Sequence, residues 1–401
     1  PKPKAKAKGK AKAAKLPKRP ARTVVEPTLT SADLDARIDA RLARLHPDAE
    51  PAPLTTDLEY VRRLYLDVTG VPPTPEQVRA FVDSPEEDKR AKLVDELLDT
   101  PEHARNWARY WREVIEFRAS NANRQQARYD VLEGWLAEQF EGNRPWDEIA
   151  AGLLTATGRT DENGAAGFIA AHASSPVQLA GEASRVFLGV QIQCAECHDH
   201  KTDSWTRQEF HELAAFFAGG RLRRVVKQQP GVRAAFAVET TPRARYTMPD
   251  LADPAKKIPV KPRFFLASSK SAVPDGLPPA QLRELAASYI TGQDNPWFAR
   301  SYVNRAWAVL MGESFYELID DLGPERAIQG GEEILFPLAD QWRAGGYDVR
   351  WLFRTLLNTR AYQRATRPSD PSAGDAQLAA ACPSRLWSDQ IFEALAVALD
   401  L

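Results

Sequence analysis

Residues that form disulfides or bind soft metals are scarce in this chain. Its 401 residues include 3 cysteines, 2 methionines and 6 histidines. Three cysteines cannot build the disulfide framework of a small secreted domain. No run of about eighteen apolar residues occurs, so no transmembrane helix is expected. The chain also lacks the phosphate-binding loop, the Gly-x-Gly-x-x-Gly pattern, His-Glu-x-x-His and Gly-x-Ser-x-Gly, so the enzyme classes that depend on these motifs are not indicated.

The formal charge of -1 conceals an asymmetry along the chain. Residues 1–22 carry eight Lys and two Arg and no acid, which leaves 43 basic against 54 acidic residues elsewhere. We expect a disordered basic tail over residues 1–28, because a Pro/Ala/Lys-rich segment cannot bury an apolar face. The tail is either a solvated linker or an arm that touches an anionic surface. Specific nucleic-acid binding is not expected, because no aromatic residue is interleaved with the lysines.

Apolar residues at helical spacing recur along most of the chain and predict a mainly α fold of bundle-like units. We expect one helical domain over residues 29–220 and a second over residues 278–401. Residues 221–277 are rich in β-branched and turn residues, which predicts a small antiparallel β insert around residues 221–267. Residues 158–174 show neither period and are expected to form a loop. The chain begins at Pro1 and stops at Leu401 within a helical pattern, so we interpret it as a trimmed fragment whose second domain is cut short.

Two helices have clear end signals. Thr206 and Glu209 are spaced as a capping box before FHELAAFFAGG. Asn295 is placed as the cap of a later helix, with Pro296 at its first position and Gly312 at its end.

The stretch VQIQCAECHDHKTDSW contains Cys194, Cys197 and His198 in the order Cys-x-x-Cys-His. This is the attachment signature of c-type haem. Two thiols at this spacing can add to the two vinyl groups of the haem, and the following imidazole can reach the iron from the same side. The signature therefore predicts haem c bound at Cys194 and Cys197, with His198 as the metal ligand.

Other uses of the cysteines stay open. A zinc site could use Cys194, Cys197, His200 and His211, although this spacing is not one of the usual zinc patterns. A thioredoxin-like dithiol would be expected in a βαβ setting, and no such pattern surrounds the motif. A purely structural role for the cysteines is the remaining alternative.

A second axial ligand would have to come from elsewhere in the chain, because His200 lies too close to His198 in sequence. We rank Met248 first, since it is predicted in a loop that Pro249 would stiffen. His211, on the helix that follows the capping box, ranks second, and an open iron site ranks third. A methionine ligand would raise the potential relative to a histidine.

Asp320 and Asp321 form the one adjacent carboxylate pair that we considered for acid–base chemistry. A solvated helix end is the favoured interpretation of this pair. Asn304 and Arg305 lie on an otherwise apolar helix, and we expect them to be buried and bonded to one of these two aspartates.

Around the cysteines the chain resembles a known family. FLGVQIQCAECHDH, with Trp205 and FHELAAFFAGG after it, resembles the planctomycete cytochrome C domain of the large, uncharacterised kind. NPWFARSYVNRAWAVLMGESFYELIDDLGP, with GYDVRWLFRTLLNTRAYQRA, resembles the planctomycete-specific domain that usually follows it. The resemblance covers roughly residues 30–400. The chain departs from the family at Lys201, where a proline is usual, and over residues 326–342.

The resemblance implies a haem c protein exported to the periplasm or another extracytoplasmic space. It further implies electron transfer, or the redox part of a larger oxidoreductase, in a context linked to polysaccharide breakdown. The redox partner is not identified, and no reaction is established for the family, so no enzyme class is assigned. The alternative function is a non-haem scaffold or binding module with a structural zinc or cysteine site.

Overall fold

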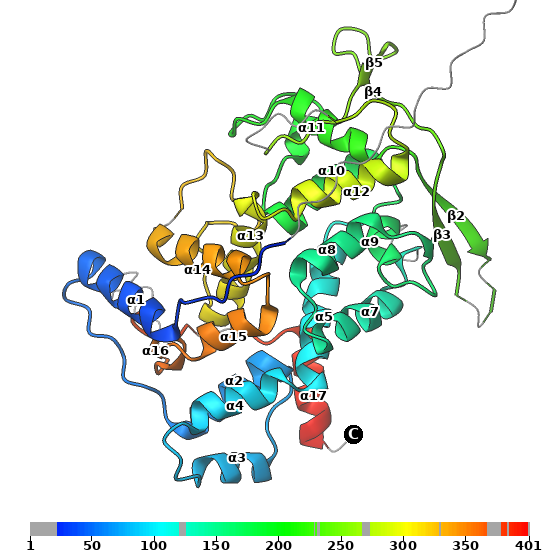
Figure 1. Ribbon diagram of the computed structural model, residues 1–401. Helices are drawn as coiled ribbons and strands as arrows, with labels where there is room; N and C mark the ends of the chain where they lie inside the picture. The colour runs from blue at the N-terminus through cyan, green and yellow to red at the C-terminus, as the bar shows by residue number, and fades with distance from the viewer. Residues whose placement is uncertain are drawn as a thin grey trace, which may run out of the picture.

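The computed structural model describes residues 22–119, 126–227, 229–230, 233–266, 273–328, 330–366, 378–382 and 385–399. The predicted mainly α fold with a small β insert is confirmed (Figure 1). The α-helices are α1 (Ser31–Leu45), α2 (Asp57–Thr69), α3 (Pro75–Val82), α4 (Lys89–Leu98), α5 (Pro101–Glu116), α7 (Tyr129–Glu141), α8 (Trp146–Thr155), α9 (Ala166–Ala171), α10 (Pro176–Ala183), α11 (Arg207–Ala214), α12 (Pro279–Ile290), α13 (Pro296–Met311), α14 (Glu332–Ala344), α15 (Val349–Leu357), α16 (Arg360–Gln363) and α17 (Ser388–Leu399).

The helix ends follow the sequence signals closely. Thr206 and Glu209 form the predicted capping box of α11. Asn295 caps α13 through its side chain, and Gly312 ends that helix in the left-handed region at φ 89°. Glycine accepts this conformation without the steric cost that a Cβ would bring.

The strands form two small antiparallel sheets. One has the order β1-β3-β2, with β1 (Gly158–Arg159), β3 (Ala235–Thr240) and β2 (Gly220–Val226), and the other pairs β4 (Tyr246–Pro249) with β5 (Lys257–Val260). Residues 158–174 are therefore not only a loop, as the sequence had suggested, because they contain β1 and α9. Two residues of strand and six of helix carry too little periodicity to be recognised.

Both helical regions contribute to one hydrophobic core. Trp111 of α5 stacks on Tyr302 of α13 with ring centroids 5.3 Å apart, and Tyr302 stacks on Trp342 of α14 at 4.6 Å. All three side chains are almost fully buried. Residues nearly two hundred positions apart in sequence thus share one interior, and such large aromatic contacts contribute strongly to stability.

The described part of the expected tail, residues 22–28, lies against the body. Arg22 forms an ion pair with the buried Asp147 at 2.8 Å, and the amide of Val25 donates to the carbonyl of Ala344. Thr28 donates its amide to Gln341. The sequence predicted a disordered tail as far as residue 28. Residues 22–28 are instead held on the body, because Arg22 pairs with a buried carboxylate. Residues 1–21 lie outside the described residues.

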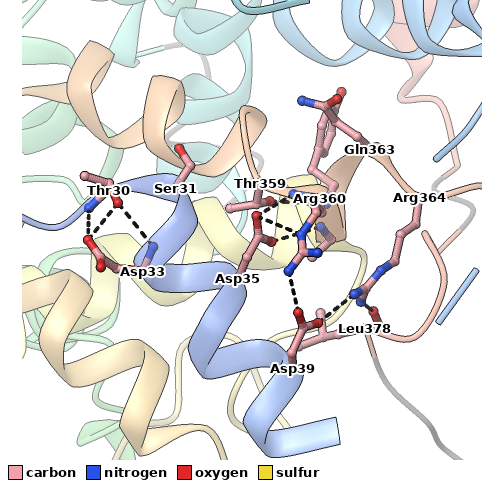
Figure 2. A network of polar contacts seen from close by, with 12 residues as sticks. Thr30, Ser31, Asp33, Asp35, Asp39, Thr359, Arg360, Gln363, Arg364 and Leu378 are labelled. Atoms are coloured by element: carbon pink, nitrogen blue, oxygen red, sulfur yellow. Dashed lines mark hydrogen bonds and ion pairs between the residues drawn. The ribbon is translucent and has the colours of Figure 1, made fainter. Parts of the chain in front are cut away.

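The N-terminal helix is joined to the C-terminal region through a polar network (Figure 2). Asp35 of α1 is buried, and its carboxylate accepts the amides of Arg360 and Ala361 at 2.9 and 3.3 Å. Asp39, one turn further along α1, pairs with the guanidinium groups of Arg360 and Arg364. Asp35 thus satisfies the first amides of α16, which would otherwise lack partners.

Candidate functional site

The cysteine motif begins in a short 3-10 helix, Gln193–Glu196, between α10 and α11, with Cys197 as the cap residue and His198 after it; residues 193–198 are called the cysteine turn below. Helix α10 continues as a π-helical turn, Ser184–Leu188, which ends at Gly189 with φ 63°. A Cβ at Gly181 of α10 would collide with the Gln193 side chain, so the helix packs directly on the start of the turn. Contact with α10 therefore helps to hold the start of the turn in place.

The reactive groups of the turn point to solvent. Cys194 and Cys197 are both exposed and free, and His198 is also exposed. The Nδ1 atom of His198 lies 2.7 Å from the carbonyl oxygen of Asp199. A carbonyl only accepts hydrogen bonds, so Nδ1 is the donor, and in the neutral ring Nε2 is then the nitrogen with the lone pair. This is the tautomer that leaves Nε2 ready to bind a metal.

His211 is buried and holds the turn in place. Its Nε2 donates to the carbonyl of Glu196 at 3.0 Å, and its Nδ1 accepts from the hydroxyl of Tyr246 at 2.7 Å. Burial lowers the pKa of His211, so the neutral ring is favoured. The single lone pair of that neutral ring is used by Tyr246. His211 therefore positions the peptide between the two cysteines and has no lone pair left for a metal.

Met248 lies in strand β4, not in the loop that the sequence had suggested. Its side chain is buried against Ala215 and Val260, and its sulfur lies 3.5 Å from a guanidinium nitrogen of Arg207. The same arginine donates to the carbonyl of Pro249 at 2.6 Å. Alternate residues of a strand face opposite sides of its sheet. The pairing of β4 with β5 therefore holds the Met248 side chain on the side that packs against Ala215 and Val260.

The four side chains expected for zinc do not converge. His200 accepts the amide of Thr202 at Nδ1, and His211 is fully engaged as described above. Within the described residues, which include this whole stretch, no group of three or more His, Cys, Asp or Glu side chains is placed to hold a metal ion. The zinc arrangement would require the turn and α11 to move relative to one another.

A buried charge cluster lies behind the cysteine turn. Arg185 is 2% exposed, forms an ion pair with Glu182 at 2.7 Å and donates to Asp320 at 3.1 Å. Asp320 also accepts from Gln191 at 3.0 Å and lies 3.9 Å from Arg305. A buried guanidinium is tolerated because two carboxylates surround it.

The contacts of Asp320, Arg305 and Asn304 can be compared with those expected from the sequence. Asp320 is not a solvated helix end, because its side chain is largely enclosed by Arg185 and Arg305. The expected contact of Arg305 with Asp320 is confirmed at 3.9 Å. Asn304 instead bonds to backbone, accepting the amide of Phe315 and donating to the carbonyl of Ile319.

The C-terminal region also contacts the chain on both sides of the cysteines. Leu322 donates its amide to the carbonyl of Gly189 at 2.6 Å. Arg326 donates to the hydroxyl of Thr202 at 2.9 Å and pairs with Asp321 at 2.8 Å. Sequence reasoning missed this clamp, although the adjacent aspartates were a visible signal. The Gly189 and Thr202 groups that Leu322 and Arg326 bind lie more than a hundred residues away, so the local pattern could not show these contacts.

Two family models match the chain. Residues 33–221 match PSCyt2, described as a protein of unknown function (DUF1549), and residues 283–401 match PSD1, described as a protein of unknown function (DUF1553). No curated protein and no solved structure matches the chain. Neither description names a cofactor or a reaction. The matches support the planctomycete-type pair of domains, with a PSCyt2 segment that contains the cysteine turn and a PSD1 segment that contains Asp320 and Arg326.

Proposed function

We propose that this chain is an extracytoplasmic c-type haem-binding protein that acts in electron transfer or as the redox part of a larger oxidoreductase. One observation carries the proposal. Cys194 and Cys197 are free and exposed three residues apart, and the adjoining exposed His198 bonds to backbone through Nδ1, which leaves Nε2 as the nitrogen available to a metal. Attachment of haem requires two accessible thiols and a neutral imidazole with its second nitrogen available.

The residues present fit covalent attachment. Cys194 and Cys197 would hold the vinyl groups as thioethers, and His198 would ligate the iron through Nε2. When bound, haem supplies one-electron redox chemistry, whose potential depends on the axial ligands and on burial. The carbonyl of Asp199 fixes the His198 tautomer, and His211 fixes the peptide between the cysteines.

The contacts of the other two candidate ligands favour an open sixth position. His211 would have to release Tyr246 or Glu196 to bind iron, and Met248 would have to leave a buried strand position. Each move leaves a buried polar group or an apolar cavity without compensation, which costs on the order of 1–3 kcal/mol. We therefore propose that neither residue ligates iron in this fold, and that solvent or a partner molecule occupies the position.

An extracytoplasmic location belongs to the same proposal. Among the described ranges of the chain, no helix is long and apolar enough to cross a membrane. The location is supported by the resemblance, which implies export.

The test is expression in a host with the cytochrome c maturation machinery, followed by a reduced pyridine haemochrome spectrum after denaturation. The wild-type chain should retain haem after acid–acetone extraction, whereas a Cys194→Ser/Cys197→Ser variant should lose all of it. Cys382→Ser is the matched control, because Cys382 is an exposed free thiol outside the motif. Haem that is equally extractable from wild type and double variant would refute the proposal. Stoichiometric zinc in that case would support a non-haem scaffold or binding module.

A further inference from the structure

A cavity of about 550 Å³ lies where the two matched segments meet. The first segment contributes Asp67 of α2 and Tyr110 of α5 to its wall. The second contributes the end of α13, residues 314–319 and the start of α17. Its volume falls within the range of small-molecule sites, roughly 300–1,000 Å³, and such sites are common between domains.

An aromatic wall forms one side of this cavity. The rings of Tyr110 and Trp387 stack with centroids 5.1 Å apart and planes inclined by 25°. Trp107 contacts the Trp387 ring edge-on behind this pair, at 6.3 Å. Trp387 is only partly buried although it has aromatic neighbours. A tryptophan held rigidly at a cavity wall can pack its apolar face against a ligand at little entropic cost.

The polar lining carries both signs of charge. Asp67 and Glu317 contribute carboxylates, whereas Arg385 contributes a guanidinium. Asp67 accepts a hydrogen bond from the Tyr362 hydroxyl at 2.8 Å, and burial raises the pKa of Asp67 to about 6. Ser314 adds a hydroxyl group. The lining has one more carboxylate than guanidinium, so it disfavours an anionic ligand most, and a charge of either sign would meet a like charge on part of the wall.

The cavity wall is linked to the cysteine turn through side chains. The positive charge of Arg305 acts on the Tyr110 hydroxyl, and Arg305 lies 3.9 Å from Asp320. Asp320 in turn accepts from Gln191, three residues before Cys194. The cavity wall and the segment just before the cysteines are therefore both connected to one buried charge cluster.

We propose that this cavity binds a neutral, hydroxyl-rich small molecule, of which a mono- or disaccharide is the simplest example. Hydroxyl groups both donate and accept, so they can pair with carboxylates, a guanidinium and a serine in the same site. The C–H face of a sugar ring matches the apolar face of Trp387. Binding at this site does not depend on haem attachment, so it can be tested with or without haem.

The test is saturation-transfer NMR on the whole chain with three probes, namely cellobiose, glucuronate and glucosamine. Cellobiose should bind at millimolar concentration, and the two charged sugars should bind more weakly. Trp387→Ala should weaken cellobiose binding about tenfold, the loss expected for about 1.4 kcal/mol. Phe392→Ala should not change it, because Phe392 lies on the same helix but is 71% exposed and outside the cavity wall.

A second variant keeps the proposal testable if Trp387→Ala does not fold. Glu317 is exposed at the cavity rim, so Glu317→Ala should fold normally and weaken cellobiose binding several-fold through loss of hydrogen bonds. Three results would each overturn the proposal. These are no cellobiose binding, tighter binding of either charged sugar, or equal binding by Trp387→Ala, Glu317→Ala and Phe392→Ala.

Discussion

The cysteine turn and the α1–α16 junction both connect the PSCyt2 segment to the PSD1 segment, but they use their polar side chains in opposite ways. At the junction, the carboxylate of the buried Asp35 accepts hydrogen bonds from the amides of Arg360 and Ala361 (Figure 2). Around the turn, groups outside the motif make the connection, as in the bonds from Leu322 to Gly189 and from Gln191 to Asp320. The thiols and the His198 Nε2 face solvent instead.

This difference distinguishes side chains that stabilise the fold from side chains that are available for chemistry. Asp35 at the junction is structural, because it accepts from two amides of α16 that would otherwise lack a partner. Side chains on the turn are held in position by their backbone and contribute little to the packed interior. Substitutions at the junction and in the buried cluster should therefore reduce stability, and substitutions on the turn should alter only its chemistry.

The largest effect is expected at Arg185, which supports the turn from within. Arg185→Ala leaves Glu182 and Asp320 without their buried cation. Removal of one partner from a buried ion pair costs about 3–5 kcal/mol, and denaturant unfolding should show this loss. Arg79→Ala removes an exposed pair with Glu76 and should change stability by less than about 0.5 kcal/mol. Equal stabilities of the two variants would contradict a structural role for the cluster.

Buried and exposed histidines should respond differently to acid. Burial, aided by Arg185, lowers the pKa of His172 to about 3, below the value of about 6.5 in an unfolded chain. The unfolded chain thus binds protons more readily, so the stability from His172 is complete above about pH 6.5 and declines as the pH falls toward 3. Between pH 7 and 4 the loss should be about 3 kcal/mol.

Two substitutions check this pH dependence. His172→Leu should make the unfolding free energy less sensitive to pH over that interval, as measured by denaturant unfolding at each pH. His198→Gln should keep the wild-type profile, because His198 is exposed. An identical pH profile for wild type and His172→Leu would show that His172 is not buried as a neutral ring.

At the junction, two aspartates on the same helix offer a matched comparison. Asp35→Ala should lower the unfolding free energy by about 2–3 kcal/mol, because two amides of α16 lose their acceptor. Asp33→Ala removes only the local capping box of α1 and should cost about 1 kcal/mol or less. A reversed order would place the main role of α1 in its own cap rather than in the junction.

Apart from the control variants, the smallest effect on stability is expected at Met248. Met248→Ala should cost about 2 kcal/mol by leaving a cavity beside Val260. In haem-loaded protein it should leave the oxidised visible spectrum unchanged, because the proposed iron site does not include this sulfur. Loss of a long-wavelength iron–sulfur charge-transfer band in the variant would restore Met248 as the axial ligand.

Local sequence signals predicted much of this architecture. The caps at Thr206 and Asn295 are set by neighbouring residues, and the structure has both. The Cys-x-x-Cys-His spacing predicted a haem attachment site, but it gave no information on the exposure of the two cysteines. The burial of Asp320 was not predictable, because it depends on Arg185, which is 135 positions away. The strand position of Met248 was missed for a related reason, since β4 has only four residues and exists through pairing with β5.

The central claim is that the exposed turn carries covalent haem, and peptide mass spectrometry tests it most directly. Wild-type protein from a host with cytochrome c maturation should yield a peptide containing Cys194 and Cys197 that is heavier by about 616 Da, the mass of one haem. The peptide containing Cys382 should be unmodified. A Cys194–Cys197 peptide of unmodified mass, from cells that load a control cytochrome c, would contradict the account.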